Sequence, residues 1–392
     1  MHIRSFQHTG TELRVFGGDD SLQWLARELE RAGARRALIV CGRSMAAGQG
    51  LSMVRDALAD RCAGVFQGVQ PDSPLPDVQR AAQALSDCQA DAVIALGGGS
   101  AIVTARAASI LLAEGSDAHG LCTRRGADGR IISPRLPAPK LPQFTVATTP
   151  TTALAKAGSA ILDPASGKRL ALFDPKTRAR AIFVDPWMAC SAPQTMVRGA
   201  SLNTLTMAIE GLESIKGSAL SDAALMHAVR LVADGLPLLD DAARQAQVRV
   251  DLILAAILCG QGTDQTGVGL ATAFGHLLGA RMDIDNGIVN ALMLPHTMRF
   301  NAPALDDRQG KVLRALERHA DPAPGGVSAA AIAAVSALLS RLQVPARLRD
   351  VGASREDFAR IAEDALDDWF VQTNPRRIES SADVLGVMQA AW

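Results

Sequence analysis

A short run of small residues is the clearest chemical signal in the sequence. The sequence Gly97-Gly-Gly-Ser100 directly follows the apolar run 91–96 and precedes a helical pattern. Glycines at a strand-to-helix turn let the backbone approach a phosphate closely, and a helix N-terminus offers free N–H groups with a favourable dipole. The pattern fits either a phosphate site or a simple tight turn.

One histidine in an apolar helical segment is a candidate for proton transfer. His276 lies in the segment 268–278, and an imidazole can donate or accept a proton near neutral pH. A histidine in such a place can also be a packed core residue. The preceding segment Gly260–Gly269 is unusually polar between two apolar helical stretches, so we expect a site-lining loop there that carries Gln261, Asp264 and Gln265.

These residues depend on elements that the hydrophobic pattern predicts. In the first half, short apolar runs alternate with amphipathic segments, which is typical of a parallel sheet with helices on both faces. Strands are expected at 13–16, 37–40, 64–69, 91–96 and 144–147, and helices at 20–32, 75–87 and 101–113. The Gly-, Pro- and Arg-rich stretch 115–141 predicts an excursion or hairpin, and the run 160–184 predicts a second pair of strands around the turn Asp163–Gly167.

The second half has a different pattern. From about Ala192 onward, apolar residues recur at three- and four-residue spacing, which predicts helices at 225–239, 248–259, 268–278, 288–300, 327–342 and 355–364. The predicted architecture is therefore a Rossmann-like α/β domain (residues 1–187) followed by an all-helical domain (residues 188–392). A ligand cleft is expected between the two.

The composition excludes several classes of protein. Lys plus Arg and Asp plus Glu number 40 each, so no net charge favours nucleic acid or a membrane surface. No apolar run is long enough for a transmembrane helix, the first residues lack a signal-peptide core, and the six cysteines form no C-x-x-C pair. We therefore expect a cytoplasmic protein with reduced thiols and a small-molecule substrate. Tyrosine is absent, which excludes a tyrosine acid or base.

The segment Thr272–His296 resembles the signature of the iron-dependent (group III) alcohol dehydrogenase family. That superfamily includes the maleylacetate reductases and has a dehydroquinate synthase-like fold. The family signature reads H-x-x-x-H and then, ten residues later, H-G-x-x-N-A-x-x-L-P-H. Here the sequence Gly287-Ile-Val-Asn290-Ala-Leu-Met-Leu-Pro-His296 keeps the second part. The resemblance extends over roughly residues 10–385. It implies a homodimeric, nicotinamide-dependent oxidoreductase whose domain 1–187 is the dinucleotide-binding domain.

The resemblance also implies which residues bind the cofactor. In the family, G-G-G-S holds the pyrophosphate, and the threonines of a P-T-T-A segment contact the cofactor. Members that use NAD often carry an aspartate near Gly42, which accepts a hydrogen bond from the ribose hydroxyl. Here Gly42, Arg43 and Ser44 supply space, a cation and a hydroxyl instead of the carboxylate. We therefore expect NADP or NAD as the cofactor, with NADP favoured. The predicted cofactor-binding residues are Gly42, Arg43, Ser44, Gly97, Gly98, Gly99, Ser100, Thr149, Thr151 and Thr152.

Four positions correspond to metal ligands of the family. Two of these ligands are an aspartate and a histidine four residues apart on one helix face, and the others are two histidines of the signature segment. Here the four positions hold Asn203, Met207, Thr272 and Asn286. Neutral amide, thioether and hydroxyl groups supply neither an anion nor an imidazole to iron or zinc, so we expect no metal at this site. A substitute set of His276, Asp264 and Asp283 stays open, although it has no recognised ligand spacing.

Without a metal, another group must stabilise the charge that develops on the substrate oxygen. His276 is the predicted catalytic residue. The predicted pocket residues are Asn203, Met207, Thr272, Asn286, Gln261, Asp264, Lys156 and Arg281. Lys156 fits either a cation beside the nicotinamide or an acidic substrate, or a solvent-facing lysine. Arg281 fits either a clamp on a carboxylate or a surface arginine.

Three functions are compatible with this set of residues. The first is an NAD(P)-dependent oxidoreductase that interconverts an alcohol and a carbonyl without a metal, with hydride transfer assisted by His276. The second is a lyase, isomerase or dehydratase that uses the same cleft. The third is a catalytically silent relative, which the two intact cofactor segments disfavour.

Overall fold

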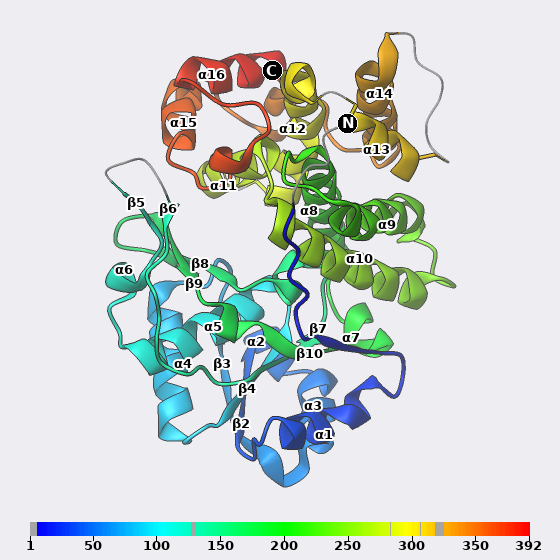
Figure 1. Ribbon diagram of the computed structural model, residues 1–392. Helices are drawn as coiled ribbons and strands as arrows, with labels where there is room; N and C mark the ends of the chain where they lie inside the picture. The colour runs from blue at the N-terminus through cyan, green and yellow to red at the C-terminus, as the bar shows by residue number, and fades with distance from the viewer. Residues whose placement is uncertain (1–5, 127–130, 283, 306, 318–324) are drawn as a thin grey trace. The chain divides into compact units, whose positions relative to one another are not determined.

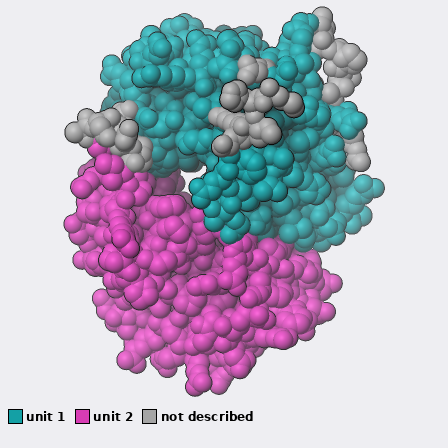
Figure 2. Space-filling model, in the orientation of Figure 1, with its two compact units in different colours: residues 1–10, 194–392 teal, residues 11–193 magenta. Residues whose placement is uncertain are grey.

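The computed structural model describes residues 6–126, 131–282, 284–305, 307–317 and 325–392. The chain divides into two compact units (Figure 2). We call residues 11–193 the sheet unit, and residues 1–10 with 194–392 the helical unit. Within the described residues, no helix is both long enough and apolar enough to span a membrane.

The sheet unit is built on six parallel strands in the order β1-β10-β7-β4-β2-β3 (Figure 1). In β2, Ile39 and Cys41 pack into a core with residues of η1, α1 and α3, whereas Leu38 and Val40 are buried on the opposite face. Burial on both faces makes β2 and β4 continuous apolar runs, which is typical of a parallel sheet. The predicted fold class is confirmed.

The strand order places β2 and β4 side by side in the sheet, with β3 as the edge strand beyond β2. From β2 the chain passes outward to β3, and it then returns to the other side of β2 to form β4. The carboxyl ends of β2 and β4 therefore flank a topological switch point, which is where open α/β sheets bind their ligands.

The segments between the main strands follow the predicted pattern, with one difference. The stretch 115–141 forms the short helix α6 and the two-residue antiparallel ladder β5–β6. Strands β8 and β9 form the predicted hairpin around Asp163–Gly167. The last part of the same run, β10, joins the six-stranded sheet instead of the hairpin.

The elements of the sheet unit are named here with their bounds. The strands are β1 (Arg14–Gly17), β2 (Ala37–Gly42), β3 (Cys62–Val69), β4 (Ala92–Gly97), β5 (Arg124–Arg125), β6 (Ile131–Ile132), β7 (Gln143–Ala147), β8 (Gly158–Asp163), β9 (Lys168–Phe173) and β10 (Ala179–Val184). The helices are η1 (Ser21–Trp24), α1 (Leu25–Arg31), α2 (Arg43–Ala46), α3 (Gln49–Leu58), α4 (Leu75–Asp87), α5 (Gly99–Glu114), α6 (Ala118–Leu121), η3 (Thr152–Ala155) and α7 (Pro186–Cys190).

The helical unit packs α8 against α9, α10 and α12, and α11 against α12 and α15. Its elements are α8 (Gln194–Glu213), α9 (Ala219–Gly235), α10 (Gln245–Thr266), α11 (Leu270–Met282), α12 (Asn286–Asn301), α13 (Gln309–Ala315), α14 (Gly326–Arg341), α15 (Phe358–Ala365), η9 (Val371–Thr373) and α16 (Ser381–Ala390). The loop expected at 260–269 is wrong, because α10 continues to Thr266. Gly262 is small because of packing: a Cβ on it would meet Leu225 Cγ of α9 at 2.5 Å.

Candidate functional site

The glycine turn lies at the carboxyl end of β4. Gly97 adopts a φ of +141°, and Gly98 precedes α5 without any side chain that caps the helix. Ser73, which is buried in the loop before α4, donates to the Ser100 carbonyl over 3.1 Å. The first backbone N–H groups of α5 therefore lie beside a turn that lacks side chains, which is the geometry of a phosphate-binding helix N-terminus.

The threonine segment packs directly onto this turn. Strand β7 pairs with β4, and Thr148 N donates to Gly97 O over 3.2 Å. A Cβ on Gly98 would meet Thr149 Oγ1 at 2.6 Å, and a Cβ on Gly99 would meet Thr151 Oγ1 at 3.2 Å. The two predicted cofactor segments are thus brought into contact.

A buried arginine fixes the backbone that follows the threonines. Arg106 of α5 has no exposed surface, and it donates to Ala153 O over 2.8 Å and to Gly158 O over 2.6 Å. Charged guanidinium groups are buried only where their donors are satisfied. Arg106 therefore ties the threonine segment, including the buried Thr152, to the helix that begins at the glycine turn. Lys156 is half-buried just after η3.

The third predicted cofactor segment follows the neighbouring strand. Gly42 ends β2 and precedes α2, whose first residues Arg43 and Ser44 are exposed. Because β2 is hydrogen-bonded to β4, this segment and the glycine turn lie on adjacent strands at the same edge of the sheet. The residues expected to bind a dinucleotide thus gather at the switch point.

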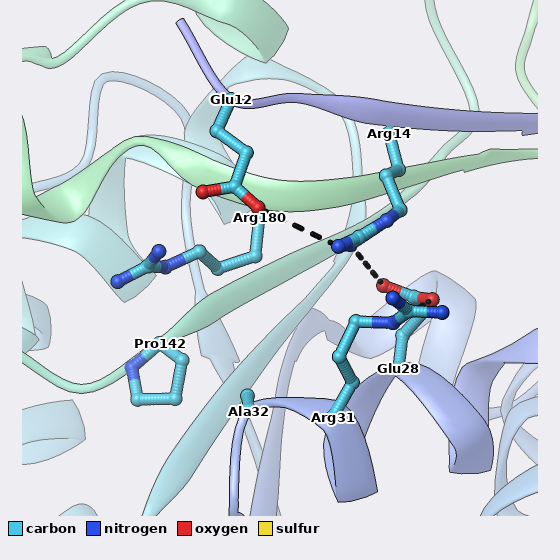
Figure 3. A pocket seen from close by; sticks show the side chains of 7 residues that line it. All are labelled: Glu12, Arg14, Glu28, Arg31, Ala32, Pro142 and Arg180. Atoms are coloured by element: carbon cyan, nitrogen blue, oxygen red, sulfur yellow. Dashed lines mark hydrogen bonds and ion pairs between the residues drawn. The ribbon is translucent and has the colours of Figure 1, made fainter.

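A charged cavity lies at the opposite edge of the sheet unit. Its volume is about 310 Å³, and residues near the amino ends of β1, β7 and β10 line it together with α1 (Figure 3). Arg14 forms ion pairs of 3.5 Å with both Glu12 and Glu28 (Figure 3). None of the predicted site residues lines this cavity.

In the helical unit, the positions of the family ligands lie on three packed helices. Asn203 Nδ2 is 3.5 Å from Met207 Sδ on α8, and Asn203 Oδ1 accepts from Asn290 Nδ2 of α12 over 2.7 Å. Asn286, also on α12, lies against Gly279 of α11, where a Cβ would clash with its side-chain oxygen. The amides of Asn203 and Asn290 therefore bind one another between α8 and α12, and Asn286 packs against α11.

Thr272 forms part of a helix cap. Its hydroxyl donates to Glu210 Oε2 over 2.5 Å, while Glu210 Oε1 accepts from Ala271 N over 2.7 Å and from Thr272 N over 3.3 Å. Glu210 of α8 thus satisfies N–H groups at the start of α11, where the helix dipole favours an anion. Burial raises the pKa of Glu210, against the lowering effect of these hydrogen bonds.

These four residues do not fit a divalent iron or zinc ion. They offer two amides, a thioether and a hydroxyl; the Asn203 amide and the Thr272 hydroxyl are already hydrogen-bonded to neighbouring side chains. Within the described ranges, no cluster of three or more His, Cys, Asp and Glu side chains could hold a metal. In the substitute set, Asp264 lies half-buried on α10, and Asp283 lies outside the described residues.

His276 lies one turn further along α11 than Thr272. Its side chain is 22% exposed, and its Nδ1 is 3.3 Å from Asp368 Oδ2. The imidazole also contacts the rings of Trp369 and Phe370, with centroid separations of 5.6 and 4.9 Å. His276 therefore belongs to a partly exposed polar and aromatic cluster, and not to the apolar core.

Other predicted pocket residues lie apart from this cluster. Gln261 is half-buried on α10, where Gln265 forms two hydrogen bonds with the backbone of Thr9. Arg281 is exposed and forms an ion pair with Asp364 of α15. This contact matches the surface arginine that the sequence left as one of two possibilities.

Several residues of these clusters were not identified from the sequence alone. Glu210 is seven residues after Asn203 and Asn290 is four residues after Asn286, so helical spacing could have placed each on the same face. Arg106 is the one charged residue among the buried, mostly apolar residues of α5, which also signals a buried, paired charge. Asp368 is 92 residues from His276, and no spacing rule links them.

Glu213, one turn after Glu210, predicts a pH-dependent stability. Burial raises its pKa from 4.5 to about 7, although Gln309 and Asn301 donate to its oxygens over 2.6 and 3.2 Å. Because the pKa is higher in the folded state than in the unfolded state, the free energy of unfolding is highest below pH 4.5, where Glu213 is protonated in both states. It falls as the pH rises through about 7 and the buried carboxyl ionises. We expect Glu213 to lower the free energy of unfolding by about 3 kcal/mol between pH 4.5 and pH 8.

Urea denaturation at pH 5, 6, 7 and 8 measures this effect. The Glu213→Gln variant should lose much of the decrease in stability with pH, because residue 213 then stays neutral. The exposed Glu363→Gln variant is the matched control and should keep the wild-type slope. An unchanged slope in Glu213→Gln would show that Glu213 is not the group that titrates.

Comparisons with known proteins agree with this arrangement. Residues 13–186 match the family described as iron-containing alcohol dehydrogenase, and residues 199–392 match the C-terminal part of the Fe-containing alcohol dehydrogenase family. Lactaldehyde reductase of Escherichia coli (strain K12) is 29% identical over 376 residues, which cover 94% of this chain and 95% of the reductase. Maleylacetate reductase 2 of Cupriavidus pinatubonensis (strain JMP 134 / LMG 1197) is 28% identical over 387 residues, covering 97% and 94%. The structure of sulfoacetaldehyde reductase from Bifidobacterium kashiwanohense in complex with NAD+ matches with a TM-score of 0.82 at 18% identity, covering 99% of each chain.

Proposed function

The chain belongs to the iron-containing alcohol dehydrogenase family, and we propose that it interconverts an alcohol and a carbonyl by metal-independent, nicotinamide-dependent hydride transfer. As an alcohol dehydrogenase-like oxidoreductase it shares its chemistry with relatives that use NAD(P). The observation that carries the proposal is the packing of Gly98 and Gly99 against the threonine segment at the carboxyl edge of the sheet.

The residues at this edge fit a dinucleotide. A turn without side chains leads into the uncapped N-terminus of α5, where a pyrophosphate would accept from backbone N–H groups. The exposed Arg43 and Ser44 follow the adjacent strand, where an adenosine ribose would lie. A cation in place of an aspartate supports NADP over NAD, because it would pair with a 2′-phosphate.

The side chains at the four metal-ligand positions of the family support metal independence, because two amides, a thioether and a hydroxyl are poor ligands for iron or zinc. When bound, the nicotinamide supplies or accepts the hydride. The proton and the charge on the substrate oxygen are then left to the protein. His276 is the residue that we assign to both tasks, because it is partly exposed and an imidazole can exchange a proton near neutral pH. Asn203 and Asn286 would contribute neutral polar groups to the pocket.

The rest of the proposal follows the family pattern. We expect a homodimer that acts on a small-molecule substrate. The six free cysteines are consistent with a reducing, cytoplasmic environment. The relatives described above are named as reductases, which supports redox chemistry over the lyase or isomerase alternative.

Two measurements test this function. Titration of the purified protein with NADPH and with NADH, followed by nucleotide fluorescence, should show binding of both, with tighter binding of NADPH. Reduction of a panel of short-chain aldehydes by the protein after treatment with a chelator should then proceed, with less than stoichiometric iron or zinc by elemental analysis. Binding of neither nucleotide would overturn the oxidoreductase proposal, and a stoichiometric metal required for turnover would overturn metal independence.

The His276→Ala variant should lose turnover while it still binds the cofactor. A general acid or base contributes about 100- to 10,000-fold to rate, so we expect kcat to fall by at least about 100-fold. The dissociation constant for NADPH should change less than about twofold, because the residues that bind it lie on other elements. His227→Ala, on the exposed face of α9, is the control and should retain wild-type kcat. Full activity in His276→Ala would remove His276 from the mechanism.

A further inference from the structure

The side chain of His276 is held by a segment far away in the sequence. Asp368, whose side chain is 8% exposed, lies 3.3 Å from His276 Nδ1, and the next two residues carry the aromatic rings that contact the imidazole. Three consecutive residues, Asp368-Trp369-Phe370, thus fix both the plane of the ring and one of its nitrogens. These contacts join α11 to the segment that follows α15.

Asp368 is itself fixed in place. Its Oδ1 accepts from the backbone N–H of Phe370 over 2.8 Å, which leaves Oδ2 for the histidine. A carboxylate can only accept hydrogen bonds, so the ring nitrogen that faces it must carry the proton. The neutral imidazole is therefore held with hydrogen on Nδ1 and a lone pair on Nε2. Among the described residues, none forms a hydrogen bond with Nε2.

We propose that Asp368 is the positioning residue of a His–Asp pair that keeps Nε2 of His276 free for the substrate. The inference rests on the proposed function, in which His276 moves the proton. In alcohol oxidation, the O–H bond breaks and its proton passes to Nε2, while the carbinol carbon loses a hydride to the nicotinamide. The Asp368 carboxylate then stabilises the imidazolium. In carbonyl reduction, the Nε2–H proton passes back to the substrate oxygen.

The Asp368→Asn substitution reverses the hydrogen bond while it preserves the shape of the side chain. The amide oxygen can still accept from Phe370 N, and the amide N–H₂ then faces Nδ1 of His276. A donor at that position requires a lone pair on Nδ1, which moves the proton to Nε2. We expect the dominant neutral tautomer of His276 to change from Nδ1–H to Nε2–H, and kcat to fall by about 100-fold with KM changed less than about threefold.

Nuclear magnetic resonance of the full chain labelled with ¹⁵N-histidine measures the tautomer directly. The signals of His276 among the seven histidines are identified by their loss in His276→Ala. The control Glu363→Gln removes an exposed carboxylate of the neighbouring helix α15 and should leave both tautomer and kcat unchanged. Because these spectra need no substrate or cofactor, they test the His–Asp pair even if the protein proves to have another activity.

A double variant separates positioning from a general effect on the fold. If Asp368 acts through His276, adding Asp368→Asn to His276→Ala should not lower kcat further. An additional loss of about tenfold or more in the double variant would overturn the proposal, because Asp368 would then act independently. An Nε2–H tautomer in the wild-type protein would also overturn it. If Asp368→Asn keeps the Nδ1–H tautomer and normal turnover, only the His–Asp pair is contradicted. If the wild type and Asp368→Asn show the expected tautomers but the protein has no redox activity, the proposed function is contradicted.

Discussion

The Gly287→Ala variant is expected to lose about 3 kcal/mol or more of stability in the helical unit. Gly287 is buried in the first turn of α12, where a Cβ would meet the carbonyl oxygen of Gly199 on α8 far inside the 3.0 Å limit that real Cβ atoms show. The obstacle is backbone, which cannot rotate away as a side chain can. Overpacking of this kind costs about 1–3 kcal/mol when neighbours can adjust, and more when they cannot.

The same contact aligns the residues of the candidate site. Asp285 accepts from Ile288 N over 3.1 Å to cap α12, and its carboxylate also lies against Gly199. If α12 moved away from α8, the hydrogen bond between Asn290 and Asn203 would be lost with it. The variant should therefore lower both stability and turnover.

Urea denaturation of Gly287→Ala and of Gly386→Ala measures this difference. Gly386 lies exposed on α16 with no atom within 4 Å of an added Cβ, so its alanine variant should be more stable by about 0.5–1 kcal/mol through helix propensity. Opposite signs for the two substitutions are the expected outcome. A Gly287→Ala protein within about 1 kcal/mol of the wild type would show that α8 and α12 do not pack at backbone contact.

The fold was predictable because its signals are local. The apolar run of β4 and the three- to four-residue spacing of α12 each reflect one face or both faces of a single element, so a short window of sequence contains the information. The prediction of a loop at 260–269 was wrong for a physical reason. Gly260 and Gly262 with the polar Gln261 between them are typical of a loop, but here Gly262 gives Leu225 room to pack against α10. Contacts between helices overrode the local pattern.

The candidate site was predictable to the extent that its residues lie in motifs. The glycine turn and the threonine segment each follow a strand, and adjacent parallel strands brought them together as expected. The partners of the other candidate site residues depend on chain packing instead. Thr272 was expected to face a substrate, whereas its hydroxyl binds Glu210, 62 residues earlier in the chain. Nothing in the residues around Asp368 indicates that it contacts His276.

The Gly98→Ala variant is expected to weaken binding of NADPH by at least about 100-fold, which corresponds to about 3 kcal/mol. The added Cβ would lie 2.6 Å from Thr149 Oγ1 and 3.4 Å from Thr149 Cγ2. Thr149 is buried, so the new methyl group must push either the threonine segment or the glycine turn out of place. Displacement of the glycine turn would move the backbone N–H groups at the start of α5 away from the position that a pyrophosphate would occupy, whereas displacement of the threonine segment would move Thr149 away from the cofactor.

A double variant determines which of the two displacements matters. Thr149→Ala removes both atoms that the new methyl group would meet, so Gly98→Ala combined with Thr149→Ala should fold without this clash. We expect the double variant to bind NADPH no more tightly than Gly98→Ala, because the methyl group still stands where the backbone must approach the phosphates.

The matched control is Gly158→Ala in β8, where no atom lies within 4 Å of the added Cβ. Its dissociation constant for NADPH, measured by the same fluorescence titration, should equal that of the wild type. Recovery of tight binding in the double variant would mean that Gly98 is small only to make room for Thr149. Tight binding in Gly98→Ala itself would place the phosphates away from the N-terminus of α5.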